Sequence, residues 1–455
     1  MGFLRALRLS LLVFGLLGVV WIAAPAAAEK PADEPFFPQA GNRGYDASYY
    51  EVDLRYDSQS GGVKAETTMY ALPSQRLSRF SLDFSGPQVT EVRVNGRRAG
   101  FSRKDGKLTV VPKSALPAGE YVTVAVSYSG VPPKIVDPDG TSEGWYRTDD
   151  GVLAVGEPQG TAAWIPCDNV PADKAKFDFV ITVPKRLKAV ANGRRHRIVH
   201  RGGLTTYDWR EGRPMSTYLA VLDVGRGKIV AGTVAGGPAY TLIDPRLERR
   251  SLPVLAELPE IVRFESGLFG PYPFSSAGSI VDYAPKLGYA LETQSRPIYP
   301  YVPDLTTVVH ETAHQWFGDS VGLKRWPEIW LNEGFATWTE WYYAERHGRR
   351  SAKAIFKSLY RVPASDQAFW NPPSAHPGSA KNLFGPSTYI RGAMALEALR
   401  LKIGTQPMLH LLHDWATAHR YGSGTIEEFT TLAESISGRN LDPFFLRWLY
   451  RRGKP

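Results

Sequence analysis

The amino-acid sequence predicts a multidomain protein with an N-terminal antiparallel β-sandwich or saddle-shaped sheet, followed by a mainly α-helical domain. Three observations indicate this fold class. The 455 residues exceed what one compact domain usually holds. Short segments of the first half alternate apolar and polar residues with a period of two, as strands do when one face is buried. From about Leu252 the apolar residues recur with a helical period instead.

The chain is expected to begin with an export signal. Arg5 and Arg8 precede an apolar run from about Leu9 to Ala24, and three alanines then lead to Glu29. The run is shorter than the ~20 apolar residues of a membrane-spanning helix, which favours cleavage after Ala28 over an uncut anchor. We therefore expect a secreted or extracytoplasmic protein with no stable membrane span after cleavage, although the sequence leaves retention of the segment open.

Four parts are expected along the chain: a signal peptide, a loose linker, a β domain and a helical domain, at residues 1–28, 29–44, 45–245 and 246–455. In the β domain, Val52 and Leu54 alternate with charged residues, and Val122–Val126 repeats the pattern. Asn95-Gly96 predicts a tight hairpin.

Composition excludes some classes of partner. The net charge is +9, but the arginines are scattered rather than gathered in a stripe, so we expect no nucleic-acid partner. Cys167 is the only cysteine, which rules out a disulfide within the chain, and it is interpreted as a packed core thiol. Nothing in the sequence indicates an oligomeric state.

The strongest chemical pattern lies on a predicted helix, Leu305 to Phe317, with Asp304 as its N-cap. His310 and His314 are four residues apart, so both imidazoles face the same side of this helix and can chelate a metal. Glu311 lies beside that position and is the predicted general base for a metal-bound water.

A catalytic zinc site needs a third protein ligand and one open position. Glu333 is the predicted third ligand, because it lies nineteen residues after His314 on a second predicted helix, Leu331 to His347, which can fold back antiparallel. Asp319, just past the first helix, is a candidate to orient a ligand histidine. One Zn²⁺ per chain is expected.

At this point the sequence resembles the gluzincin aminopeptidases, the zinc peptidases related to aminopeptidase N and to leukotriene-hydrolysing aminopeptidases. The resemblance covers both predicted domains. It rests on HETAHQWFGDSV at 310–321, WLNEGFATW at 330–338, YALETQSRPIY at 289–299, TYIRGA at 388–393 and EPQGTAAWIPCDNVPADKAKF at 157–177.

The resemblance implies further site residues. Glu292 stands where the family binds the free α-amino group of the substrate, although Tyr289 and Thr293 depart from the family's Gly-Ala-Met-Glu-Asn pattern. Gln159 corresponds to a second amino-group contact, a role that the nearby Glu157 could take over. Tyr389 corresponds to the tyrosine that donates to the developing oxyanion.

These observations predict a secreted zinc metallo-aminopeptidase, a hydrolase that uses zinc-activated water on peptides with a free N-terminus. Two alternatives stay open: a thermolysin-like endopeptidase, which shares the metal site but has no use for Glu292, and a non-catalytic binding module stabilised by zinc. The preferred N-terminal side chain and peptide length are not readable from the sequence, nor is an epoxide hydrolase side activity.

Overall fold

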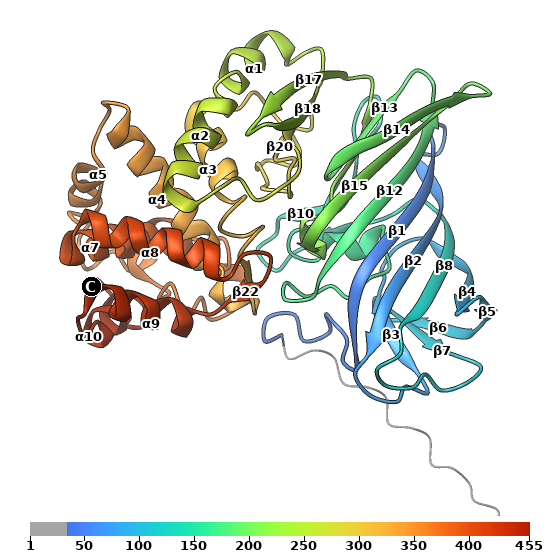
Figure 1. Cartoon of the computed structure of the whole chain (residues 1–455), viewed down its shortest axis with the longest axis horizontal. Coiled ribbons are helices and arrows are strands. Elements are labelled where there is room, and N and C mark those ends of the chain that lie inside the picture. Colours follow the sequence, from blue (N-terminus) through green and yellow to red (C-terminus); the bar gives the residue numbers. More distant parts are fainter. Residues whose placement is uncertain (1–33) are drawn as a thin grey trace, which may run out of the picture.

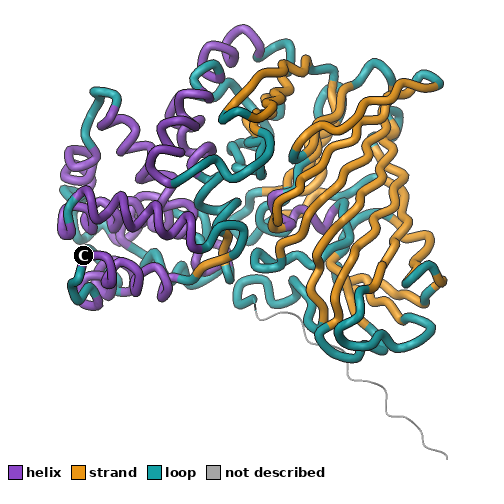
Figure 2. Tube along the Cα trace, viewed as in Figure 1, coloured by secondary structure: helices purple, strands orange, loops and turns teal. Residues whose placement is uncertain are grey.

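The computed structural model describes residues 34–455, with strands gathered in the N-terminal half and helices in the C-terminal half (Figure 1; Figure 2). This arrangement confirms the predicted fold class. The predicted signal peptide, residues 1–28, lies outside the described residues. Within those residues, the structure has no helix long and apolar enough to span a bilayer.

The largest element of the N-terminal half is an eight-stranded sheet. In spatial order its strands are β14 (Arg194–Arg201), β15 (Leu204–Ser216), β12 (Lys174–Pro184), β1 (Tyr45–Asp57), β2 (Gly62–Pro73), β8 (Val122–Gly130), β4 (Gln88–Val94) and β5 (Arg97–Arg98). The predicted alternation is confirmed on β1, where Val52 and Leu54 are buried. The pairing is antiparallel except for β1 and β12, which run parallel. The predicted hairpin at Asn95-Gly96 joins β4 to β5, with positive φ at both residues.

Two smaller sheets complete the β half. The five-stranded sheet consists, in spatial order, of β13 (Lys188–Ala191), β16 (Leu222–Gly225), β11 (Val152–Val155), β10 (Ser142–Arg147) and β9 (Lys134–Val136). The three-stranded sheet consists of β3 (Phe80–Asp83), β7 (Lys107–Val111) and β6 (Gly100–Lys104). The five-stranded sheet matters most for the site, because the turn after β11 carries Glu157 toward the helical half.

A four-stranded sheet joins strands from both sides of the predicted domain boundary at residue 245. Its strands are β17 (Lys228–Val234), β18 (Gly237–Ile243), β19 (Ala277–Val281) and β20 (Ile298–Tyr299). β18 runs parallel to β19. A division near residue 227 would keep this sheet whole and would assign β17 and β18 to the helical half.

The helical half contains ten α-helices within the described chain. They are α1 (Glu248–Leu255), α2 (Leu258–Phe269), α3 (Leu305–Ala313), α4 (Trp330–Arg346), α5 (Ala352–Leu359), α6 (Gln367–Trp370), α7 (Gly392–Ile403), α8 (Thr405–Ala418), α9 (Ile426–Ser437) and α10 (Asp442–Phe445). A short two-stranded sheet, β21 (Gly322–Leu323) and β22 (Ser423–Gly424), brings together the segment between α3 and α4 and the segment between α8 and α9.

Both predicted metal-site helices are present. Asp304 caps α3 as expected, because its Oδ1 accepts a hydrogen bond from the backbone N–H of Thr307 at 2.8 Å. The helix ends at Ala313, four residues earlier than predicted, because the chain then follows tighter turns to Gly318, whose φ is +131°. α4 matches its prediction within a residue at each end and is buried along most of its length.

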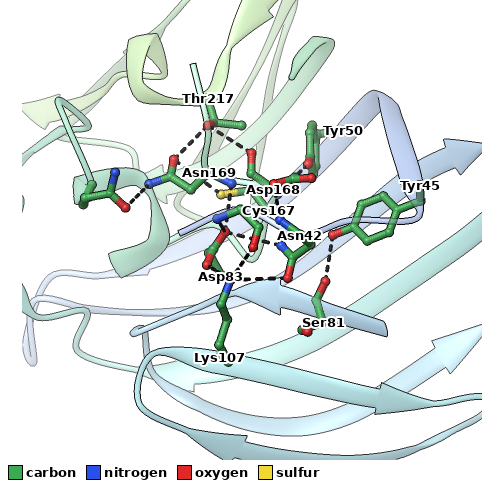
Figure 3. A network of polar contacts seen from close by, with 12 residues as sticks. Asn42, Tyr45, Tyr50, Ser81, Asp83, Lys107, Cys167, Asp168, Asn169 and Thr217 are labelled. Carbon is green, nitrogen blue, oxygen red and sulfur yellow. Dashed lines mark hydrogen bonds and ion pairs between the residues drawn. The ribbon is translucent and has the colours of Figure 1, made fainter. Parts of the chain in front are cut away.

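The segment before β1 is packed, which contradicts the prediction of a loose linker over residues 29–44 for its described part. The backbone N–H of Asn42 donates to Asp168 at 3.0 Å (Figure 3). The backbone N–H of Gly41 donates to Asp83 at 2.8 Å. Glu34 is buried and accepts from the backbone N–H of Trp326 at 3.0 Å. Composition suggested a linker because proline-rich segments are often loose, but these long-range bonds hold the segment against both halves.

Candidate active site

Helix α3 places two imidazoles side by side. His310 lies on this helix and His314, four residues later, is its C-cap residue with helical backbone angles; their ring centroids lie 4.7 Å from each other. This spacing corresponds to about one helical turn, so both rings lie on the same face. The arrangement follows from local helix geometry alone.

Glu333 comes to the two rings from the first turn of α4. Its Oε2 lies 3.2 Å from Nε2 of His310 and 3.3 Å from Nε2 of His314. Ligand atoms at ~2.0 Å from a tetrahedral zinc ion lie about 3.3 Å apart, so these separations suit one shared metal. Burial alone would raise the pKa of Glu333, but the adjacent histidines lower it to about 2, which keeps the carboxylate ionised.

The second nitrogen of each ring is occupied by another acceptor. Nδ1 of His310 contacts Oε1 of Glu340 at 2.6 Å, and Nδ1 of His314 contacts the carbonyl oxygen of Phe317 at 3.0 Å. A ring that donates from Nδ1 keeps its Nε2 free to bind a metal. The donor set, two imidazoles and a carboxylate with both rings oriented, therefore fits a zinc ion.

The sequence-based assignment of Asp319 as the orienting carboxylate is wrong. Neither of its carboxylate oxygens has a hydrogen-bond partner in the described chain, and its backbone carbonyl accepts from Nζ of Lys174 at 2.8 Å. Glu340 takes that position instead. Sequence reasoning missed it, although Glu340 lies seven residues after Glu333 on the same helix, a spacing that brings two side chains to one face.

Glu311 is buried and lines the same cavity as the predicted ligands. Its ligand oxygen lies within 4.8 Å of donor atoms of His314 and Glu292. Burial raises the pKa of Glu311 to about 8, against the lowering effect of the two histidines. A carboxylate in this position can exchange a proton with a water molecule bound beside it.

Two further carboxylates, Glu157 and Glu292, lie next to the metal ligands. Their ligand oxygens and that of Glu333 are all within 4.8 Å of one another. Oε1 of Glu157 and Oε1 of Glu292 are buried and lack a hydrogen-bond partner. Burial raises the pKa of both carboxyl groups, and the charge of Glu292 adds to the effect on Glu157. A cation with several N–H donors bound there would pair with both carboxylates and offset the effect of burial on their charged forms.

Gln159 lies outside this site, in disagreement with the resemblance-based expectation. Its Oε1 accepts from Nδ2 of Asn169 at 3.3 Å, next to the network shown in Figure 3, and its Nε2 donates to the carbonyl of Pro158 at 3.1 Å. It lines a different cavity, one bordered by Phe36. Glu157, two residues earlier, faces the cleft instead.

Tyr389 reaches the site from a single π-helical turn, Ser387–Arg391. Its ring stacks on that of His310, with centroids 6.0 Å apart and planes inclined by 21°. Arg391 holds this turn by donating to the backbone carbonyls of Trp448 and Arg451, at 2.9 and 2.6 Å. Burial and then the charge of Glu333 raise the pKa of Tyr389 well above its usual 10, so the phenol keeps its proton and can donate it in a hydrogen bond.

The three predicted metal ligands line one cavity of about 550 Å³ between the two halves, together with Glu157, Glu292, Glu311, Glu340 and Tyr389. Gln159 and Asp319 do not line it. Its walls consist of Asp139, Thr141, Glu157, Gly288, Tyr289, Ala290, Glu292, Tyr301, Asp304, Thr306, Thr307, His310, Glu311, His314, Glu333, Glu340, Phe384 and Tyr389. A cavity of this volume can hold part of a peptide, and its polar side chains can orient the peptide.

Comparison with known families covers both halves of the chain. Residues 46–219 match the peptidase M1 N-terminal domain, and residues 301–448 match the peptidase family M1 domain. The leucyl aminopeptidase of Saccharolobus solfataricus is 25% identical over 443 residues, 89% of this chain and 53% of that protein. Aminopeptidase M1-C of Oryza sativa subsp. japonica is 25% identical over 95% of this chain and 52% of its own length.

The chain spans about half the length of these curated relatives. Among solved structures, it is similar to an M1 zinc metallopeptidase from Deinococcus radiodurans, with 28% identity and a TM-score of 0.86. That alignment covers 94% of this chain and 98% of the other. A mutant M1 zinc metallopeptidase from the same organism, bound to a Tyr-Ser-Ala substrate, aligns with a TM-score of 0.83 over 94% of this chain and 99% of the other, at 28% identity.

Proposed function

Because the chain belongs to the M1 peptidase family, we propose that it is a zinc-dependent aminopeptidase, which hydrolyses the first peptide bond of peptides with a free N-terminus. The observation that carries this proposal is the pair of buried, unpartnered carboxylate oxygens of Glu157 and Glu292 beside the three predicted metal ligands. An α-ammonium group bound there lies next to the metal position. The pair would thereby select the end of a peptide and exclude internal bonds.

The protein groups have distinct parts in the proposed reaction. Glu157 and Glu292 bind the ammonium group and hold the first carbonyl carbon beside the metal site. Bound zinc, held by His310, His314 and Glu333, supplies Lewis-acid polarisation and lowers the pKa of water toward ~7. This chemistry lets one positioned base complete the proton transfers.

Glu311 is the proposed base. It takes the proton of the attacking water and then delivers it to the nitrogen of the leaving amine, so no proton is gained or lost overall. Tyr389 donates a hydrogen bond to the carbonyl oxygen as negative charge develops on it. Stacking of Tyr389 on His310 and the anchoring of its turn by Arg391 support this assignment.

A panel of aminoacyl fluorogenic amides tests the proposal. The zinc-loaded protein is expected to cleave amides with a free α-amino group, and to stop when the amine is acetylated or the metal is removed by a chelator. Cleavage of N-acetylated peptides at internal bonds would indicate the endopeptidase alternative. Zinc binding without any hydrolysis would indicate the non-catalytic alternative.

We also propose that the protein acts outside the cytoplasm. The support is the arginine-flanked apolar run and the alanines that precede Glu29 in the sequence. N-terminal sequencing of protein recovered from the exported fraction is expected to begin at Glu29. A mature protein that keeps Met1 would contradict the proposed cleavage.

A further inference from the structure

We propose, building on the proposed aminopeptidase function, that the preferred substrates begin with arginine or lysine, and that Asp139 selects this cationic first side chain. Asp139 contributes to the wall of the active-site cavity from the β half of the chain.

The charge of the cavity differs from that of the whole chain. The chain carries a net charge of +9, yet seven of the residues that line the cavity are Asp or Glu. Among the described residues, no lysine or arginine lines it. A cleft with one sign of charge and low-dielectric walls concentrates the opposite charge. The cavity therefore favours cationic groups of a substrate over anionic ones.

Most of these carboxylates already have a partner or a place in the proposed reaction. Glu333 and Glu340 serve the metal site, Glu311 is the base, and Glu157 with Glu292 receives the ammonium group. Two acidic residues are left, Asp139 and Asp304. They lie on different elements, because Asp139 is in the loop between β9 and β10 and Asp304 is at the start of α3.

Asp304 lines the cavity from the helical half, at the start of α3. It caps α3 and lies with Thr306 and Thr307 in the two turns that precede His310. Its Oδ1 accepts from the backbone N–H and the hydroxyl of Thr307, at 2.8 and 3.1 Å. It serves as a control position inside the same cavity.

Asp139 lines the same cavity as Glu157 and Glu292. It belongs to the loop between β9 and β10, and four residues later Oε1 of Glu143 accepts from the backbone N–H of Gln159 at 2.7 Å. This bond ties the start of β10, which directly follows the loop, to the turn that carries Glu157. The hydroxyl of Tyr289 donates to the carbonyl of Ser142 at 3.1 Å, which fixes the start of β10 to the helical half as well. The C-terminal end of the loop is thus held from both sides of the cleft.

The carboxylate of Asp139 is available to a ligand. Its Oδ1 accepts from the backbone N–H and the hydroxyl of Thr141, at 2.8 and 2.7 Å, which orients the group. Within the described chain Asp139 forms no ion pair, and it is half-buried. The nearby cation on β9, Lys134, lies 4.0 Å over the ring of Tyr146 and does not line the cavity.

The cavity also offers aromatic surface to a side chain that has a long aliphatic part and a charged end. Tyr289, Phe384 and Tyr389 line the cavity with aromatic rings. The methylene groups of an arginine or lysine side chain pack on such rings, and their cationic ends are attracted to the ring faces. A neutral side chain of the same length would keep the packing and lose the ion pair with Asp139.

The test compares arginine with citrulline, an uncharged side chain of nearly the same shape. The zinc-loaded protein is assayed on arginyl, citrullyl and leucyl fluorogenic amides, and kcat/KM is compared for the wild type, Asp139→Asn and Asp304→Asn. A charge-assisted hydrogen bond predicts roughly 10- to 100-fold higher kcat/KM for arginine than for citrulline in the wild type. In Asp139→Asn, the asparagine oxygen can still accept from Thr141, and in Asp304→Asn, the asparagine can still cap α3.

The arginine-to-citrulline ratio decides the outcome, because it does not depend on the fraction of folded enzyme. A ratio that falls to near one in Asp139→Asn and is unchanged in Asp304→Asn supports the proposal. A wild-type ratio near one, or a ratio unaffected by Asp139→Asn, overturns the specificity while leaving the aminopeptidase function intact. Failure to cleave any amide, the leucyl one included, refutes the proposed function and this inference together.

Discussion

Replacement of Glu340 should weaken zinc binding although Glu340 is not a ligand. Its Oε1 contacts Nδ1 of His310 at 2.6 Å, and the two side chains are only 19% and 12% exposed. A hydrogen bond to a charged group in such a site contributes about 1.5–3 kcal/mol. Since each 1.4 kcal/mol corresponds to a tenfold change, Glu340→Ala should lower zinc affinity roughly 10- to 100-fold.

Competition with a fluorescent chelator at fixed pH measures this change directly. Glu248→Ala is the matched control, because Glu248 pairs with Lys228 at 2.9 Å at the surface of α1, away from the cavity. Its zinc affinity should equal that of the wild type. Zinc affinity of Glu340→Ala within about twofold of the wild type would refute the idea that this contact orients His310.

The remaining predictions concern catalysis, recognition and pH. Glu311→Gln should retain zinc while losing about 10²- to 10⁴-fold in kcat, and near wild-type turnover would exclude Glu311 as the base. Tyr389→Phe should lower kcat by about 10²- to 10³-fold with little change in KM. Assays over a full range of substrate concentrations separate the two constants, and a change confined to KM would contradict this role. Glu157→Gln should raise KM for aminoacyl amides, whereas Gln159→Ala should leave it unchanged, and the reverse result would restore the resemblance-based assignment. Burial raises the pKa of Glu211 from 4.5 to about 7, so the folded state binds the extra proton and the free energy of unfolding falls as pH rises through this window, by up to about 3 kcal/mol. Urea denaturation at several pH values should show a smaller fall for Glu211→Gln, and parallel curves for both proteins would contradict this reasoning.

Local patterns were enough to predict much of the metal site. Asp304 begins α3 because its side chain can accept from the third residue of the helix, and this needs no contact beyond one turn. The two histidines face one side for an equally local reason, the helical repeat. The alternation along β1 likewise predicted which residues are buried, since successive side chains of a strand point to opposite faces.

The assignments that failed all depend on distant parts of the chain. Asp319 and Glu340 are both carboxylates near the metal helices in sequence, and only the packing of α4 against α3 places Glu340 on His310. Glu157 and Gln159 belong to one turn, and the bond from Asn169 to Gln159 decides which of them faces the cleft. The position of the segment around Asn42 depends in the same way on its bond to Asp168.

The sequence by itself determined the order of the β and helical halves and the two helices that present His310, His314 and Glu333, because periodicity and capping act over a few neighbouring residues. The tertiary structure alone decided which carboxylates surround the metal position and which face the substrate. The direction of a side chain in a turn or loop depends on the partners it meets from remote segments, and a one-dimensional pattern carries no record of those partners.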